Sequence, residues 1–388
     1  MSKNPLADKG KARGEPEPET APARELRRFR LKGCLVRAVR DAAVICLGFL
    51  AVVYWFQARL ILPGANTQGQ PDAQVRPRGD AELLELKTKT GDRVVAMFGV
   101  ALTTDGKPDP AAASRPTMLF FYGNAMCLNY ATSLFDRFRR LGLNVVIPDY
   151  VGYGMSGGSP SEKGCQATAD AVYDDVVSTR GVDPRRIVAA GWSLGGAVAI
   201  DLAARRPVGG LIAFSTFTST NDLARTFVPL ALPRWFFVHR FESLSKIPTI
   251  TCPILLGHGR RDSLVPFAMF ERLAAAAKTP TTTIVIDNAD HNEFFDVGGD
   301  RIDQAISAFC TKIAAAMPVN AALPSTCSSC VGKRQPSRQS TSGEIGASWD
   351  TTACPLDRQA SATRLPCKAR STSAPRGRRP DERAPCRA

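Results

Sequence analysis

The chain has 388 residues, 44% of them hydrophobic, which is enough for one large core or two small ones. Its formal net charge is +14, but residues 1–40 carry +6 and residues 318–388 carry +7, which leaves +1 for residues 41–317. Because the basic charge belongs to the two ends and no basic face with interleaved aromatic residues is present, the sequence argues against nucleic-acid binding.

The cysteines and histidines give no sign of a metal site. The chain has eleven cysteines, and only Cys327 and Cys330 have a C-x-x-C spacing, without a partner pair or a strand–helix context. It has three histidines and no H-E-x-x-H motif, so zinc would find few ligands. We therefore expect no metal and no cofactor.

The N-terminal part changes from a polar segment to an apolar one. Residues 1–40 are rich in proline, glutamate and then arginine, and we expect them to be disordered. Residues 42–56 carry no charge, and the apolar stretch reaches Leu62, close to the roughly 20 residues that span a bilayer. Tyr54 and Trp55 lie where an interfacial aromatic belt would fall. Residues 41–62 therefore predict a transmembrane signal anchor.

Two alternatives exist for residues 41–62. A buried core helix seldom follows so basic a segment, and a cleaved signal peptide would have small residues, rather than aromatic ones, before its cleavage site. With a signal anchor, the positive-inside rule places residues 1–40 in the cytoplasm. The catalytic domain is then expected on the opposite, periplasmic or extracytoplasmic, side of the membrane.

The middle of the chain alternates strands and helices. Residues 63–81 form a Gly/Pro/Gln-rich linker, and a hairpin turning at 90–92 begins a domain that we place at 82–317. Residues 217–248 are aromatic and proline-rich and predict a small cap. Residues 318–388 lack apolar periodicity and predict a disordered basic tail that contains cysteine. The strand-like segments are 117–122, 144–148, 186–191, 210–214, 253–256 and 282–286; the helix-like segments are 134–141, 162–179, 194–205, 267–278 and 301–317.

A serine turn is the strongest motif in this domain. Residues 191–195 read G-W-S-L-G, between a strand-like run and a helix-like run. This motif at a strand-to-helix turn is typical of a nucleophile elbow. Gly191 and Gly195 let the strand and the helix approach, and Ser193 then projects above the helix N-terminus. The alternative is a glycine-rich turn with an incidental serine.

A serine hydroxyl needs a base, and the chain offers three histidines. His239 lies in the predicted cap with no strand end beside it. His258 lies within G-H-G after a strand, as a packed turn residue would. His291 follows a late strand and precedes the last helix, on a loop that can lie over Ser193. We therefore expect His291 to be the base, with His258 as the alternative.

The base in turn needs an acid to orient it, and Asp262 is the predicted one. It follows the preceding strand, so it lies at the same edge of the sheet as His291. The order Ser193, Asp262, His291 is also the order in which nucleophile, acid and histidine accompany a nucleophile elbow of this kind. Asp287 and Asp290 are alternatives, but a sequence neighbour rarely points at the far nitrogen of its own histidine.

Two backbone N–H groups should face the oxyanion that forms during acyl transfer. Leu194, directly after the serine, supplies one. Asn124, in the loop after the strand at 117–122, is expected to supply the other.

Several motifs together resemble the membrane-anchored α/β hydrolases related to eukaryotic depalmitoylase-like hydrolases, over roughly residues 50–316. The resemblance implies a serine esterase or thioesterase in which Ser193 is acylated and water activated by His291 releases the acyl group. Tyr122 stands where that family usually has histidine, and the cysteine-rich tail has no counterpart there. The motifs are Y-W-F-Q-A-R-L-I-L-P at 54–63, F-Y-G-N-A at 121–125, D-Y-V-G-Y-G-M-S-G-G-S-P-S-E at 149–162, the serine turn, and the loops at 257–266 and at His291.

The sequence therefore predicts an α/β-hydrolase fold, with a mostly parallel sheet, helices on both faces and a small cap, behind one transmembrane helix. The expected function is hydrolysis of a small-molecule or lipid-like acyl ester or thioester. The alternatives are a serine peptidase, which would normally show a further specificity domain, and a non-catalytic membrane adaptor. Six apolar cap residues could bind an acyl chain or simply pack: Phe227, Leu230, Leu232, Trp235, Phe236 and Phe237.

Overall fold

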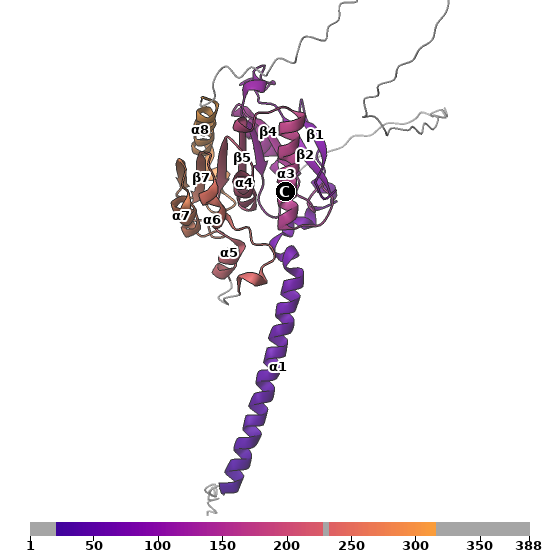
Figure 1. Ribbon diagram of the computed structural model, residues 1–388, viewed down its shortest axis with the longest axis vertical. Coiled ribbons are helices and arrows are strands. Elements are labelled where there is room, and N and C mark those ends of the chain that lie inside the picture. The colour runs from indigo at the N-terminus through magenta and orange to yellow at the C-terminus, as the bar shows by residue number, and fades with distance from the viewer. Residues whose placement is uncertain (1–20, 228–232, 316–388) are drawn as a thin grey trace, which may run out of the picture. The chain divides into compact units, whose positions relative to one another are not determined.

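The computed structural model describes residues 21–227 and 233–315 (Figure 1). The predicted tail at 318–388, residues 1–20, and the predicted cap residues Leu230 and Leu232 lie outside the described residues. Eight strands form one sheet in the order β1-β2-β4-β3-β5-β6-β7-β8. They are β1 (Glu82–Lys87), β2 (Arg93–Gly99), β3 (Thr117–Phe121), β4 (Asn144–Pro148), β5 (Ile187–Trp192), β6 (Gly210–Phe214), β7 (Ile254–Gly259) and β8 (Thr281–Ile286).

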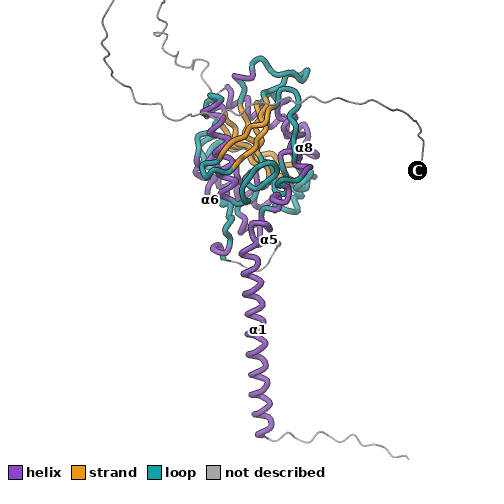
Figure 2. Tube along the Cα trace, turned by 90° about the vertical axis from the view of Figure 1, so that its right-hand side faces the viewer, coloured by secondary structure: helices purple, strands orange, loops and turns teal. Residues whose placement is uncertain are grey.

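The sheet is mostly parallel, as predicted. Strand β2 pairs antiparallel with β1, which forms the predicted hairpin, and antiparallel with β4; every pairing from β4 across to β8 is parallel. Parallel neighbours need crossover connections, and helices provide them here. Figure 2 shows the strands lying between these helices.

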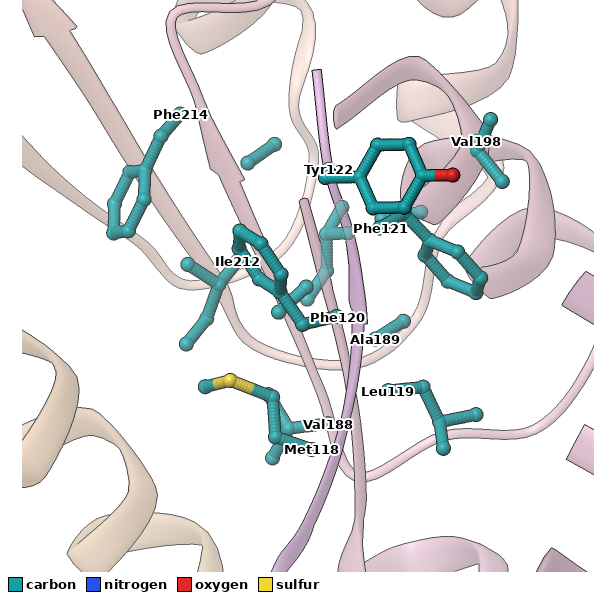
Figure 3. Close-up of a cluster of buried hydrophobic side chains, with 14 of the residues drawn as sticks. Met118, Leu119, Phe120, Phe121, Tyr122, Val188, Ala189, Val198, Ile212 and Phe214 are labelled. Carbon is teal, nitrogen blue, oxygen red and sulfur yellow. The ribbon is translucent and has the colours of Figure 1, made fainter. Parts of the chain in front are cut away.

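The central strands are covered on both faces. Every residue of β3, β4 and β6 is buried, although successive side chains of a strand point to opposite faces. In β3, Met118 and Phe120 lie on one side of the strand and Leu119 and Phe121 on the other (Figure 3). This two-sided burial explains why the strands appear in the sequence as continuous apolar runs.

The helices that follow the strands pack on the sheet and hold the ends of the strands in place. The helix α4 packs on β5, β6 and β3, and α8 packs on β7 and β8. The helices of the domain are α2 (Thr132–Arg140), α3 (Glu162–Asp174), α4 (Leu194–Arg205), α5 (Thr220–Phe227), α6 (Ser243–Lys246), α7 (Phe267–Ala276) and α8 (Phe294–Ala315).

The N-terminal helix α1 spans Ala21–Ile61. Residues 21–40, expected to be disordered, are thus helical. The only proline of α1, Pro22, lies in its first turn, where proline is tolerated, and good helix formers such as arginine, leucine and alanine follow. Within residues 21–227 and 233–315, no helix is both long enough and apolar enough to cross a membrane, and a span at 41–62 is therefore not supported.

Residues 63–81 pack on the domain instead of forming a free linker. Short 3₁₀ helices cover Pro63–Thr67 and Pro71–Ala73, with Leu62 and Ala73 fully buried. The side chain of Gln68 donates to the carbonyls of Ser156 and Gly158. The prolines and glycines that suggested a linker therefore form turns that follow the surface of the domain.

Among its described residues, the predicted cap contains two short helices, α5 and α6, and a 3₁₀ turn at Arg234–Phe236. Phe236 and Phe237 are buried and contact each other edge to face, whereas Phe227 and Trp235 are exposed. The described cap residues thus divide into packing residues and exposed ones.

Candidate active site

The serine turn has the strained backbone of an elbow. Ser193 joins β5 to α4 with φ 57° and ψ −118°, a conformation that L-residues rarely adopt. A Cβ atom on Gly191 would lie 2.1 Å from the carbonyl oxygen of Gly195, and one on Gly195 would lie 1.8 Å from that of Phe121. Both predicted glycines are therefore required, because strand and helix backbones touch at these positions.

The structure brings the three predicted triad residues together. The Nε2 atom of His291 lies 3.0 Å from Oγ of Ser193, and its Nδ1 atom lies 2.7 Å from Oδ2 of Asp262. The serine follows β5, the aspartate follows β7 and the histidine follows β8, so all three lie at the carboxyl edge of the parallel sheet. Each is more than nine-tenths buried, which strengthens the electrostatic interactions among them.

The carboxylate of Asp262 is fully paired. Its Oδ1 accepts the backbone N–H groups of Leu264, at 3.0 Å, and Val265, at 2.6 Å. Its Oδ2, besides contacting His291, lies 3.3 Å from Nε2 of His258. The backbone thus fixes one oxygen and leaves the other facing the histidines.

The two other histidines contact backbone groups rather than Ser193. The Nε2 atom of His258 lies 2.9 Å from the carbonyl oxygen of Val265, and burial lowers the pKa of this imidazole. His239 accepts a hydrogen bond from the backbone N–H of Glu162, and burial lowers its pKa as well. Neither makes a hydrogen bond with Ser193 among the described residues, so His258 supports the acid rather than replacing His291.

The two alternative aspartates lie outside the relay, by which we mean the contacts that join Ser193, His291 and Asp262. The carboxylate of Asp287 pairs with Arg260 at 2.8 Å and is exposed. Asp290 accepts hydrogen bonds from the backbone N–H and hydroxyl of Ser263 and from the backbone N–H of His291. Asp290 thus holds the two loops together without reaching the histidine ring.

The predicted oxyanion residues come from the serine turn itself and from the loop after the neighbouring strand β3. Leu194 is the first residue of α4, where a backbone N–H has no acceptor within the helix. Asn124 follows β3, and Gly123 beside it approaches Trp192 so closely that a Cβ atom would lie 2.5 Å from the ring. The side chain of Asn124 is already engaged, because it donates to the carbonyl of Ile61 and accepts from Ala125 N–H. The backbone N–H of Asn124 is the group that is expected to donate to the oxyanion.

A buried carboxylate under this loop was not predicted from the sequence. Asp149, at the end of β4, accepts hydrogen bonds from the hydroxyl of Tyr122 at 2.8 Å, from Leu128 N–H at 2.6 Å and from Met155 N–H at 2.7 Å. Tyr150 donates to the carbonyl of Tyr122. Asp149 is fully buried, and its burial raises its pKa to about 6.

The sequence did carry a signal for this network. Asp149 begins one of the motifs that underlie the family resemblance, and it follows a fully buried strand. Tyr122 is the residue that departs from the family pattern, and its hydroxyl reaches that carboxylate. Burial raises the pKa of Tyr122 well above its usual range, so it stays a hydrogen-bond donor.

An aromatic ring also lies beside the histidine. The ring of Trp192 lies 5.1 Å from that of His291, with an interplanar angle of 30°. Because Trp192 immediately precedes the serine, the elbow positions both the nucleophile candidate and the ring beside its base.

The sheet order, the elbow and the relay of serine, histidine and aspartate define an α/β hydrolase. A protein-family model described as the α/β hydrolase fold matches residues 116–236. An uncharacterized protein of Mycobacterium tuberculosis is 32% identical over 287 residues, which cover 73% of this chain and 98% of the relative. Alpha/beta hydrolase domain-containing protein 17B of Xenopus laevis is 30% identical over 223 residues, covering 56% of this chain and 72% of the relative. The chain therefore belongs to the family of α/β hydrolases that contains these proteins.

Solved structures of similar fold include two with distant sequences. The mouse alpha/beta hydrolase domain-containing protein 10 is 19% identical, with a TM-score of 0.46 over 60% of this chain and 99% of that one. A butyrate-bound esterase, Est2 of Thermogutta terrifontis, is 20% identical, with a TM-score of 0.48 over 62% of this chain and 98% of that one.

Proposed function

We propose that this protein is a serine hydrolase that cleaves a carboxylic ester or thioester through an acyl-enzyme intermediate. The observation that carries the proposal is the continuous relay from Ser193 through His291 to Asp262, with contacts of 3.0 and 2.7 Å. A binding protein gains nothing from a buried relay that ends on a strained serine.

The proposed first step is acylation. The Nε2 atom of His291 accepts the hydroxyl proton as Oγ of Ser193 attacks the acyl carbon, and the imidazolium then donates that proton to the departing alcohol or thiol. Asp262 holds Nδ1–H and stabilises the positive ring. Because its other oxygen is fixed by two backbone N–H groups, the carboxylate is expected to keep its direction during the reaction.

The proposed second step is hydrolysis of the acyl-enzyme. A water molecule gives a proton to Nε2 of His291 and attacks the acyl carbon, and Ser193 leaves with that proton. In both steps the backbone N–H groups of Leu194 and Asn124 are assigned to the oxyanion. The chemistry needs no metal or cofactor.

The proposed substrates carry an apolar acyl group. Support comes from the aromatic cap, in which Phe227 and Trp235 remain exposed while Phe236 and Phe237 pack together. Apolar walls with few polar groups are typical of sites that bind acyl chains. A serine peptidase on the same fold is the alternative, and it predicts cleavage of peptide amides, which an esterase leaves intact.

Labelling with a fluorophosphonate probe tests the proposal. The wild-type protein should be labelled, Ser193→Ala should not, and Ser215→Ala serves as a matched control. Ser215 is likewise buried, has a positive φ and follows the adjacent strand. Folded wild-type protein that is not labelled, or Ser193→Ala that is labelled equally, would contradict the assignment and favour a non-catalytic adaptor.

The membrane location stays a prediction from the sequence. It places the N-terminus in the cytoplasm and the hydrolase domain on the opposite side. Protease protection of the full chain in sealed membranes tests this location: the domain should be cut only from the side opposite the cytoplasm.

A further inference from the structure

The side chain of Asn124 makes hydrogen bonds at both of its polar atoms. Its Nδ2 donates to the carbonyl of Ile61 at 2.5 Å. Its Oδ1 accepts from the hydroxyl of Tyr153 at 3.0 Å and from the N–H of Ala125 at 3.0 Å. Because a carbonyl oxygen only accepts and a backbone N–H only donates, these partners fix which way the amide points. The residue whose backbone N–H is assigned to the oxyanion is thus held through its side chain.

The backbone directly after Asn124 has a conformation that needs support. Ala125 has a φ of 58°, in the left-handed region that an alanine rarely adopts. A residue in this region keeps its conformation only where its surroundings hold it there. Release of the Asn124 amide would let the turn relax toward an ordinary φ and would change the direction of the neighbouring N–H groups.

Tyr153 is itself fixed by packing. It is fully buried, and its ring meets that of Tyr150 edge to face, with 5.4 Å between the ring centres. A Cβ atom on Gly64 would lie 2.0 Å from the ring of Tyr153, so the chain just after α1 lies directly against it. Burial raises the pKa of Tyr153 above its usual range, so the hydroxyl keeps its proton and remains a donor to Asn124.

Two tyrosines from one segment hold the loop after β3 on either side of Gly123. Tyr150 donates to the carbonyl of Tyr122 at 2.8 Å, and Tyr153 donates to the side chain of Asn124. Both tyrosines follow β4, the strand that pairs with β3. The segment after β4 therefore holds the loop at two points, and the end of α1 holds it at a third.

We propose that Tyr153 and the carbonyl of Ile61 position the oxyanion site, because together they clamp the amide of Asn124 and so direct its backbone N–H. We call these two hydrogen bonds the Asn124 clamp. Tyr153 is then a positioning residue, since it acts through Asn124 and does not touch the substrate. The end of α1 becomes part of the active site instead of a separable N-terminal element. The inference rests on the proposed function, since the role that it assigns belongs to that reaction.

Tyr153→Phe tests the clamp in the full chain. It keeps the buried ring and removes the hydroxyl that donates to Asn124. We expect kcat for p-nitrophenyl butyrate to fall about tenfold with KM nearly unchanged, because a misdirected oxyanion donor weakens binding of the transition state and not of the substrate. Tyr173→Phe is the matched control and should keep the wild-type kcat, since Tyr173 lies on α3 and donates to the carbonyl of Pro207.

A second pair of variants disturbs the clamp from the N-terminal side. Gly64→Ala would place a Cβ atom 2.0 Å from the Tyr153 ring, whereas the nearest atom to a Cβ on Gly157 lies at 3.6 Å. We expect Gly64→Ala to lower kcat at least as much as Tyr153→Phe, and Gly157→Ala to keep the wild-type value. Circular dichroism and thermal unfolding check the folding of each variant.

A double-mutant cycle separates positioning from an independent effect on stability. Asn124→Ala removes the amide through which Tyr153 acts, and kcat should fall by about tenfold or more. Adding Tyr153→Phe should then lower kcat no further, because both changes break the same contact. Losses that multiply in the double variant would show that Tyr153 acts elsewhere and would overturn the clamp.

The wild-type protein and Ser193→Ala separate this inference from the proposed function. If the wild type turns over the ester, Ser193→Ala does not, and both Tyr153→Phe and Gly64→Ala keep the wild-type kcat, the clamp is wrong and the hydrolase function stands. If the folded wild type neither turns over the ester nor reacts with the fluorophosphonate probe, the proposed function fails and the clamp fails with it.

Discussion

The serine elbow and the loop after β3 are held in place in different ways. The elbow is fixed by its own backbone, because Gly191 and Gly195 allow contacts that any side chain would block. The loop after β3 is fixed by side chains from distant segments, among them Asp149 and Tyr150. The elbow should therefore be insensitive to pH, whereas the loop depends on a buried carboxylate.

The largest effect is expected from Gly195→Ala, which breaks the elbow itself. The added Cβ would lie 1.8 Å from a carbonyl oxygen of β3, so the strand or the helix must move. We expect a loss of about 3 kcal/mol in the free energy of unfolding and no probe labelling. Gly48→Ala is the control, because a Cβ there meets nothing within 4 Å. Denaturant unfolding measures both, and equal stability of the two variants would contradict the packing argument.

Asp262→Asn is expected to leave the elbow intact and disable the relay. The amide cannot stabilise a positive imidazole, so kcat should fall by about 10⁴ while KM changes little. Asp287→Asn is the matched control, since that exposed carboxylate pairs with Arg260. Steady-state assays with a soluble ester measure both. If kcat of Asp262→Asn stays within a factor of about ten of the wild type, Asp262 is not the acid that orients His291.

Asp149→Asn tests the pH sensitivity of the second loop. Burial raises the pKa of Asp149 to about 6 in the folded state, above its ordinary value of 3.8. The folded protein therefore binds more protons than the unfolded chain between these pH values. This carboxyl lowers the free energy of unfolding by up to about 3 kcal/mol as the pH rises from 4 to 6.

The measurement compares unfolding of the wild type and of Asp149→Asn across that pH range. The variant should be less stable overall, because its amide cannot accept all three hydrogen bonds. The difference in stability between the two proteins should narrow as the pH rises from 4 to 6. A difference that is independent of pH would contradict the assigned titration.

Tyr122→Phe is expected to have the smallest effect. It removes one of three donors to Asp149, which costs about 1–3 kcal/mol of stability and raises the pKa of that carboxyl further. If the loop positions the backbone N–H of Asn124, kcat should fall more than KM rises. Tyr173→Phe is the control, because its hydroxyl donates to the carbonyl of Pro207. Equal kcat values for the two variants would show that Tyr122 acts only on stability.

The sheet and the close approach of Ser193, Asp262 and His291 could be predicted because their signals are local. Continuous apolar runs predict buried parallel strands. The glycines and serine at 191–195 are typical of one turn geometry, the nucleophile elbow. Asp262 and His291 were found because each directly follows a strand, and parallel strands bring their carboxyl ends to one edge. The residue order then reduced the choice to one triad.

The remaining features depend on contacts between distant segments. The hydrogen bond from Tyr122 to Asp149 connects residues 27 positions apart. No local pattern in the sequence specifies that contact. The composition of 63–81 indicated turns but not that they pack on the domain. Residues 21–40 are helical although their charge suggested disorder, because their single proline, Pro22, lies in the first turn and the residues after it favour a helix.

Trapping the acyl-enzyme is the most direct test of Ser193 as the nucleophile. Wild-type protein is mixed with a p-nitrophenyl ester, quenched in acid within the first turnover, digested and examined by mass spectrometry. If Ser193 is the nucleophile, its peptide gains the acyl mass and that of Ser215 does not. Turnover with no acylated peptide, or acylation of another residue, would contradict the assignment of Ser193 as the nucleophile.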